Sequence, residues 1–118
     1  MRCLIVDDSP EFVDAARNLL ESRGITVVGV AASASQAVRC FEELRPDVTL
    51  VDVNLGAESG FDVVEQLQRV GGSPSLPMIL ISTHSAEDFA DLIAASPAVG
   101  FLAKATLSPD AIRALLST

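Results

Sequence analysis

Polar side chains of complementary charge follow four of the five short apolar runs in this sequence of 118 residues. Asp7 and Asp8 come directly after the first run, Asp52 after the third, Ser82 after the fourth and Lys104 after the fifth. An aspartate after a strand is often only a turn or cap residue, and a lone serine or lysine there is more often structural. The combination of five such groups indicates one shared site.

The chemistry of this set is that of phosphoryl transfer. Carboxylates brought close together repel, and three of them with Lys104 leave a formal charge of −2 (three minus one), which a divalent cation cancels. Ligands that are all oxygens suit Mg²⁺, or alternatively Mn²⁺, better than zinc. An aspartate can act as the nucleophile, and the metal, Lys104 and the Ser82 hydroxyl can neutralise the phosphoryl oxygens. The residues therefore predict a Mg²⁺-dependent phosphoryl site.

A repeat of strand and helix is what must position these groups. Unbroken apolar runs are typical of parallel strands that are buried on both faces, and strict alternation with helical patterns indicates a parallel sheet covered on both sides. We predict an α/β protein: a flavodoxin-like, doubly wound, five-stranded parallel sheet of order 2-1-3-4-5 with five helices, the order being inferred from the class. The expected strands cover residues 3–6, 25–32, 48–51, 77–81 and 99–102.

Helix boundaries are indicated by caps and breakers. Ser9-Pro10 and Ser108-Pro109 each pair an N-cap serine with a proline at the first helical position, and Ser33 with Gln36 forms a capping box. Gly24 is expected to end the first helix. Helices are also expected over residues 59–70 and 85–95, with a loop over 71–74. The apolar face of the first helix is expected to carry Phe12, Ala16, Leu19 and Leu20.

This order of strands brings the polar groups together. All carboxyl ends of parallel strands lie at one edge, and ligands bind there at the switch point between strands one and three. We therefore expect Asp7, Asp8 and Asp52 to converge, flanked by Ser82 and Lys104.

Five segments around the polar residues form a characteristic set of motifs: Val6-Asp7-Asp8-Ser9, Val51-Asp52-Val53-Asn54-Leu55, Ser59-Gly60-Phe61, Ile79-Leu80-Ile81-Ser82 and Gly100-Phe101-Leu102-Ala103-Lys104. With these motifs the chain resembles, over essentially its whole length, the CheY-like receiver domain of bacterial response regulators. The intervals from Asp8 to Asp52, Asp52 to Ser82 and Ser82 to Lys104 also match that family. The resemblance implies that residues 1–118 are one receiver domain.

The resemblance implies a phosphorylation-dependent switch in two-component signalling. Asp52 would accept a phosphoryl group from a sensor histidine kinase or a histidine phosphotransfer protein, and the domain would catalyse only this transfer and its own dephosphorylation. Asp8, Asp52 and the backbone carbonyl of Asn54 would ligate Mg²⁺, with Asp7 acting largely through water, and Lys104 would pair with the phosphate.

The resemblance also implies the conformational response. Ser82 would shift toward the phosphoryl group and Phe101 would rotate inward behind it, although Phe101 also suits an ordinary core position. Asn54 and His84 match positions that tune dephosphorylation, although His84 is equally typical of an exposed loop. The face made by helix four, strand five and helix five would bind a downstream protein or a second copy, and the first helix would dock the kinase.

Three positions depart from the family pattern. Gly56 stands where many members have proline, so a looser loop is expected after Asp52. Ala105 stands where many have a cis-proline, and a cis bond before alanine costs about 3 kcal/mol, which leaves this geometry open. Ser82 replaces the commoner threonine. No catalytic group is removed.

Composition excludes several classes. A net charge of −8 disfavours direct contact with nucleic acid or anionic membranes. Cys3, Cys40 and one histidine match no zinc motif, and the two thiols suit a reducing cytosol better than a redox pair. No apolar segment approaches the ~20 residues of a membrane span, so a soluble, cytoplasmic protein is expected.

Other functions fit the residues less well. A phosphatase of the haloacid dehalogenase type needs an acid at position 54, which is Asn54, and a flavin or dinucleotide module would not place Asp7 and Asp8 against phosphate. A phosphorylation-independent module would not need the full acidic set. The chain is expected either to act alone or to be the receiver of a longer regulator with helix-turn-helix output, which the Lys104-Ala105 ending resembles.

Overall fold

A parallel sheet forms the centre of the computed structural model, which describes residues 1–71 and 76–117. Its strand order is β2-β1-β3-β6-β7, and every neighbouring pair is parallel. In chain order these are the first to fifth long strands, so the predicted order 2-1-3-4-5 is confirmed. The strands are β1 (Arg2–Val6), β2 (Thr26–Ala31), β3 (Val48–Asp52), β6 (Met78–Ser82) and β7 (Gly100–Ala103).

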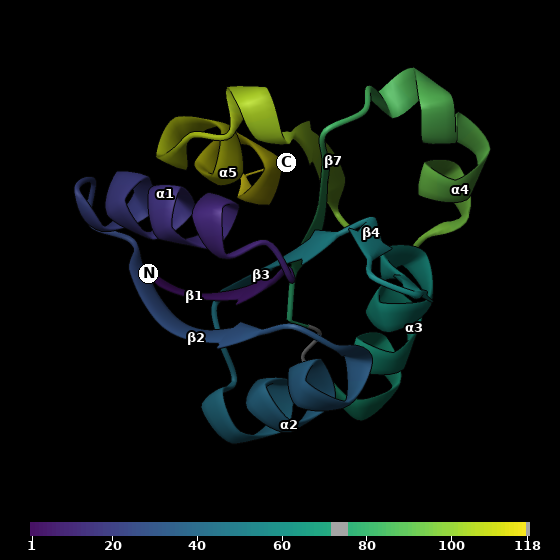
Figure 1. The fold of residues 1–118 in the computed structure, drawn as a ribbon, viewed down its shortest axis with the longest axis horizontal. Helices are drawn as coiled ribbons and strands as arrows, with labels where there is room; N and C mark the ends of the chain where they lie inside the picture. Colours follow the sequence, from purple (N-terminus) through teal and green to yellow (C-terminus); the bar gives the residue numbers. More distant parts are fainter. Residues whose placement is uncertain (72–75, 118) are drawn as a thin grey trace.

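Helices cover both faces of this sheet (Figure 1). One apolar core lies between the sheet and α1 and α5, and the other lies between the sheet and α2 and α3, with α4 at its margin. This is the doubly wound arrangement expected from the alternating pattern. The helices are α1 (Pro10–Glu21), α2 (Ala34–Leu44), α3 (Gly60–Gly71), α4 (Ala90–Ala95) and α5 (Pro109–Leu116), with 3₁₀ turns η1 (Ala86–Phe89) and η2 (Lys104–Thr106).

The helix caps follow the sequence signals in part. Ser108 and Ser33 accept hydrogen bonds from the backbone N–H groups of Ala111 and Gln36, as predicted. Ser9 is the N-cap of α1, but its side chain makes no cap hydrogen bond. The sequence therefore predicted all three N-cap positions correctly. Only Ser33 and Ser108 accept a cap hydrogen bond through the side-chain hydroxyl.

Three expectations at the helices were wrong. The first helix ends at Glu21 rather than at Gly24, which lies in the following turn at φ +87°. Leu19 is exposed, because the buried stripe of α1 runs through Val13, Ala16 and Leu20. The helix expected over residues 85–95 is a 3₁₀ turn followed by the six residues of α4.

The loop expected over residues 71–74 lies mostly outside the described residues, which resume at Leu76; Gly71 itself is the last residue of α3. The remaining boundaries lie within about two residues of expectation, as helix and strand ends usually do. Within the described ranges, no helix is long and apolar enough to cross a membrane. Cys3 is buried and Cys40 half-buried, and both are free thiols.

A short antiparallel hairpin after β3 was not expected. β4 (Asn54–Leu55) pairs with β5 (Glu58–Ser59) around a two-residue turn. Gly56 occupies the first turn position at φ +59°, as such turns require. Proline cannot adopt this φ, so Gly56 permits a paired hairpin here instead of the looser loop expected.

Candidate functional site

Strand register brings the acidic residues together. Val6 of β1 lies opposite Val51 of β3, so the next residues, Asp7 and Asp52, leave the sheet side by side. Asp52 in turn lies opposite Ile81, which precedes Ser82. The predicted convergence at the carboxyl edge, between strands one and three, is therefore what the structure contains.

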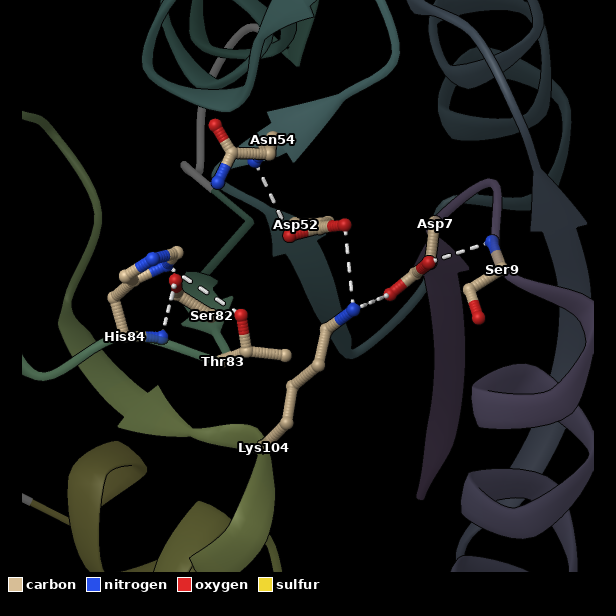
Figure 2. A network of polar contacts seen from close by, with 8 residues as sticks. All are labelled: Asp7, Ser9, Asp52, Asn54, Ser82, Thr83, His84 and Lys104. Atoms are coloured by element: carbon tan, nitrogen blue, oxygen red, sulfur yellow. Dashed lines mark hydrogen bonds and ion pairs between the residues drawn. The ribbon is translucent and has the colours of Figure 1, made fainter.

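The ammonium group of Lys104 bridges two of the carboxylates (Figure 2). Its Nζ lies 2.7 Å from Asp7 Oδ2 and 3.3 Å from Asp52 Oδ2. The Lys104 side chain is only 12% exposed, and the side chains of Asp7 and Asp52 are 0% and 8% exposed. One positive charge therefore serves two buried negative charges.

Asp52 has a raised pKa. Burial is the largest cause, and the neighbouring Asp7 adds to it, while the Asn54 backbone N–H and Lys104 act in the opposite direction and lower the pKa. The Asn54 N–H donates to Asp52 Oδ1 over 3.2 Å. The net direction shows that Lys104 does not fully compensate this buried, repelling pair of carboxylates.

Asp7 is held by the start of α1. Its Oδ1 accepts a hydrogen bond of 2.8 Å from the Ser9 N–H, as Figure 2 shows. Its Oδ2 is buried and makes the ion pair with Lys104, but has no hydrogen bond of good geometry among the described residues. This oxygen can therefore still accept a hydrogen bond.

The residues fit a divalent metal ion. One carboxylate oxygen from each of Asp7, Asp8 and Asp52 lies within 4.8 Å of the others, and Asp8 is exposed to solvent. The uncompensated charge, the spare acceptor on Asp7 and the all-oxygen donor set suit a hard cation that keeps some of its water.

Ser82 lies beside the carboxylates but does not bond to Asp52. It is fully buried, and its Oγ accepts the backbone N–H of His84 over 3.0 Å. His84 is exposed and packs edge-on against Phe89, with ring centroids 6.1 Å apart. Phe101 is half-buried and lies 6.3 Å from the same Phe89 ring. His84 and Phe101 therefore both contact Phe89, and Ser82 is joined to His84 by its hydrogen bond.

The β4–β5 hairpin and the start of α3 pack closely against the acidic residues. A Cβ on Gly56 would lie 3.3 Å from Asp8 Oδ2, and one on Gly60 would overlap the Asp52 carbonyl oxygen. The Gly60 N–H also donates to the Val53 carbonyl over 2.7 Å. Glycine at position 60 is thus needed for α3 to begin directly against the backbone of Asp52.

Two contacts at the site were missed by the sequence reasoning. The Phe12 ring of α1 lies under the Lys104 ammonium, 4.4 Å from it to the centroid. Glu58 Oε1 accepts the Ala34 N–H at the start of α2 over 2.9 Å, which ties the hairpin to that helix. The Gly56 turn signal could have indicated the hairpin, but neither contact has a signal in the sequence.

Comparison with known proteins identifies this arrangement. The family model described as the response regulator receiver domain matches residues 3–117. The chain belongs to that family. The receiver-domain resemblance of the sequence is thereby confirmed, together with its CheY-like fold.

Curated relatives share this region within longer proteins. The receiver chain is 35% identical over 112 residues to the alginate biosynthesis transcriptional regulatory protein AlgB of Pseudomonas aeruginosa, covering 95% of the chain and 24% of the relative. It is 30% identical over 104 residues to the DNA-binding transcriptional activator EvgA of Escherichia coli, covering 88% and 50%. The chain thus spans half or less of these relatives.

A solved structure agrees with this fold. The two-component response regulator of the LuxR family from Aurantimonas sp. SI85-9A1 superposes with a TM-score of 0.84 at 26% identity, covering 98% of this chain and 82% of that one.

Proposed function

We propose that this receiver domain accepts a phosphoryl group on Asp52 in a Mg²⁺-dependent reaction and changes its output surface in response. The observation that carries the proposal is the Lys104 ammonium held between the buried carboxylates of Asp7 and Asp52, with Asp8 beside them. Burying a charge cluster that is not fully compensated costs free energy. Such clusters therefore occur preferentially at sites of binding or chemistry.

The chemistry needs few groups. A carboxylate oxygen of Asp52 attacks phosphorus, and the bond from phosphorus to the donor's imidazole nitrogen breaks. The donor ring, protonated on its other nitrogen, takes the bonding electron pair and leaves as neutral histidine. Lys104 pairs with the new phosphoryl oxygens, and Ser82 can leave the His84 N–H to donate its own hydroxyl. Asp8, Asp52 and the carbonyl of Asn54 would hold the cation, and Asp7 would act on it largely through water. When bound, Mg²⁺ supplies positive charge to the phosphoryl oxygens.

The response passes from Ser82 to Phe101. Movement of Ser82 toward Asp52 opens space behind it, into which the Phe101 ring rotates inward. Phe101 and Phe89 are both half-buried and in contact, so their rearrangement alters the surface of η1, α4 and β7. Asn54 and the exposed His84 border the site and set the lifetime of the phosphorylated state.

The partners follow from this scheme. A histidine kinase or histidine phosphotransfer protein docks along α1 and supplies the phosphoryl group in the cytoplasm. The face of α4, β7 and α5 binds a second copy or a downstream protein. Residues 1–118 act as one receiver domain, either alone or, as in the relatives above, within a longer regulator.

Acetyl phosphate with Mg²⁺ tests the acceptor. The intact mass of the chain should rise by one phosphoryl group, and Asp52→Asn should abolish the gain. Asp62→Asn, an exposed aspartate on α3, is the matched control and should be labelled normally. Labelling that persists in Asp52→Asn would refute the assignment.

Titration with Mg²⁺ separates the metal ligands from the phosphate partner. Asp8→Ala should bind Mg²⁺ at least about tenfold more weakly, because it loses a proposed direct ligand and even the loss of an outer-shell partner typically weakens metal binding by about tenfold or more. Lys104→Ala should keep the metal affinity but uncouple phosphorylation from the conformational change. Unchanged affinity in Asp8→Ala would contradict the proposed ligand set.

A further inference from the structure

The Phe12 ring lies where it can act on Lys104. It comes from the first turn of α1, is half-buried, and faces the ammonium group at 4.4 Å from the ring centroid. The face of an aromatic ring carries partial negative charge and attracts a cation within about 6 Å. This contact is well inside that range.

The Lys104 ammonium group contacts two carboxylates and one aromatic ring. Asp7 and Asp52 lie on its carboxylate side at 2.7 and 3.3 Å, and the Phe12 ring supplies an apolar wall. A lysine side chain has several rotatable bonds, so its head group needs such contacts to stay in one place. With only 12% of the side chain exposed, water does little to compete with them.

We propose that Phe12 is a positioning residue, which holds the Lys104 ammonium at the phosphoryl site through its ring face. When Asp52 is phosphorylated, Lys104 turns its charge to the phosphoryl oxygens, and the ring keeps contact with the cation without competing as an anion. Phe12 also links this charge to α1. The inference rests on the proposed roles of Asp52 and Lys104.

A role in packing alone would place the same ring at the same position. Phe12 also touches the apolar core between the sheet and α1, so its removal lowers stability in either case. The two roles need different properties of the side chain. Packing needs only apolar volume, whereas positioning needs the partial negative charge on the face of an aromatic ring. Phe12→Leu keeps an apolar side chain without the face, and Phe12→Tyr keeps the face.

Lys104 is the only lysine in the chain, so its side chain is simple to observe. With lysine labelled for NMR, the ε-methylene protons should show an upfield ring-current shift in the unphosphorylated wild type. The shift should persist in Phe12→Tyr and disappear in Phe12→Leu. Phe41→Leu, the same change at a buried phenylalanine of α2, is the matched control and should leave it unchanged.

The phosphorylation rate with acetyl phosphate and Mg²⁺ should follow the same order. We expect Phe12→Leu to lower the rate constant about threefold to tenfold and Phe12→Tyr to stay within about twofold, from the usual strength of cation–π contacts. Phe41→Leu should keep the rate. A Lys104 shift that survives in Phe12→Leu, or equal rate losses in the Tyr and Leu variants, would overturn the proposal.

Labelling of Asp52 and the NMR shift of Lys104 together separate this proposal from the proposed function. If wild-type Asp52 takes no phosphoryl group, the proposed function fails and the positioning role fails with it, even where the ε-methylene shift is present. If Asp52 is labelled and the shift is absent, only the role of Phe12 fails.

Discussion

The central strand β3 and the region of η1, α4 and β7, residues 86–103, are packed very differently. All five residues of β3 are buried between β1 and β6. All four residues of β7, at the edge of the sheet, are half-buried, and η1 and α4 contain no buried residue. Segments with few buried contacts open or shift at lower free energy than core strands.

The difference matches the two tasks of the switch proposed above. Asp52 is carried by the tightly packed strand, where its carboxylate lies 3.3 Å from the Lys104 ammonium group. Phe101 is carried by the loosely packed region, where a rearrangement displaces little buried surface. In the proposed switch, the chemistry thus takes place on the tightly packed strand and the movement takes place in the loosely packed region.

The largest expected contrast is in stability. Leu50→Ala in β3 should lower the free energy of unfolding by about 2–5 kcal/mol, because Leu50 is fully buried. Leu92→Ala in α4, where the side chain is 54% exposed, should change it by about 0.5 kcal/mol or less. Denaturant unfolding of both variants measures this. Equal losses would mean that the two regions are packed alike.

A second contrast concerns the negative charge of Asp52 at the end of β3. Since burial and Asp7 raise the pKa of Asp52, the folded chain binds this proton more tightly than the unfolded chain does. The charged form therefore costs stability at neutral pH, and that cost is lost as the pH falls through the raised pKa.

Asp52→Asn removes this cost. In the presence of a chelator at neutral pH, the variant should be more stable to denaturant than the wild type. The advantage should shrink as the pH approaches the ordinary carboxyl value of about 4. A less stable Asn variant at neutral pH would show that Lys104 outweighs burial and repulsion at Asp52.

The smallest expected effect concerns the buried hydroxyl group of Thr49 in β3. Thr49 Oγ1 is buried and has no hydrogen-bond partner among the residues that the structure describes. Thr49→Val keeps the shape and removes the unpaired hydroxyl, so it should raise the free energy of unfolding by about 1 kcal/mol. Thr26→Val, at an exposed position of β2, is the control and should be near neutral. A destabilised Thr49→Val would mean that the hydroxyl is bonded in solution.

Much of this fold and of the acidic cluster could be predicted from the sequence, because both depend on periodic patterns. Apolar runs ending in Asp7, Asp52 and Ser82 define the strands and their polar ends together, and a parallel sheet brings those ends to one edge. The expected positions of Asp7, Asp8, Asp52 and Lys104 needed only the strand order.

The details that could not be predicted depend on contacts distant in the sequence. No local pattern brings Phe12 under Lys104 or Glu58 to the first turn of α2. The break between η1 and α4 was missed for a related reason: residues 85–95 have a helical pattern, but with no buried residue in the segment, packing does not enforce a continuous helix.

An amide-shift map tests the central claim most directly, namely that a phosphoryl group on Asp52 acts through the loosely packed region. A beryllium fluoride mimic of the phosphoryl group should be added with Mg²⁺ to the wild type and to Asp52→Asn. In the wild type, the largest changes should run from residue 82 to residue 105 and into α5. The amides of α2 should change least, apart from Ala34, which bonds to Glu58. No such pattern should arise in Asp52→Asn. Largest changes on α2 with Phe101 unmoved would contradict the account.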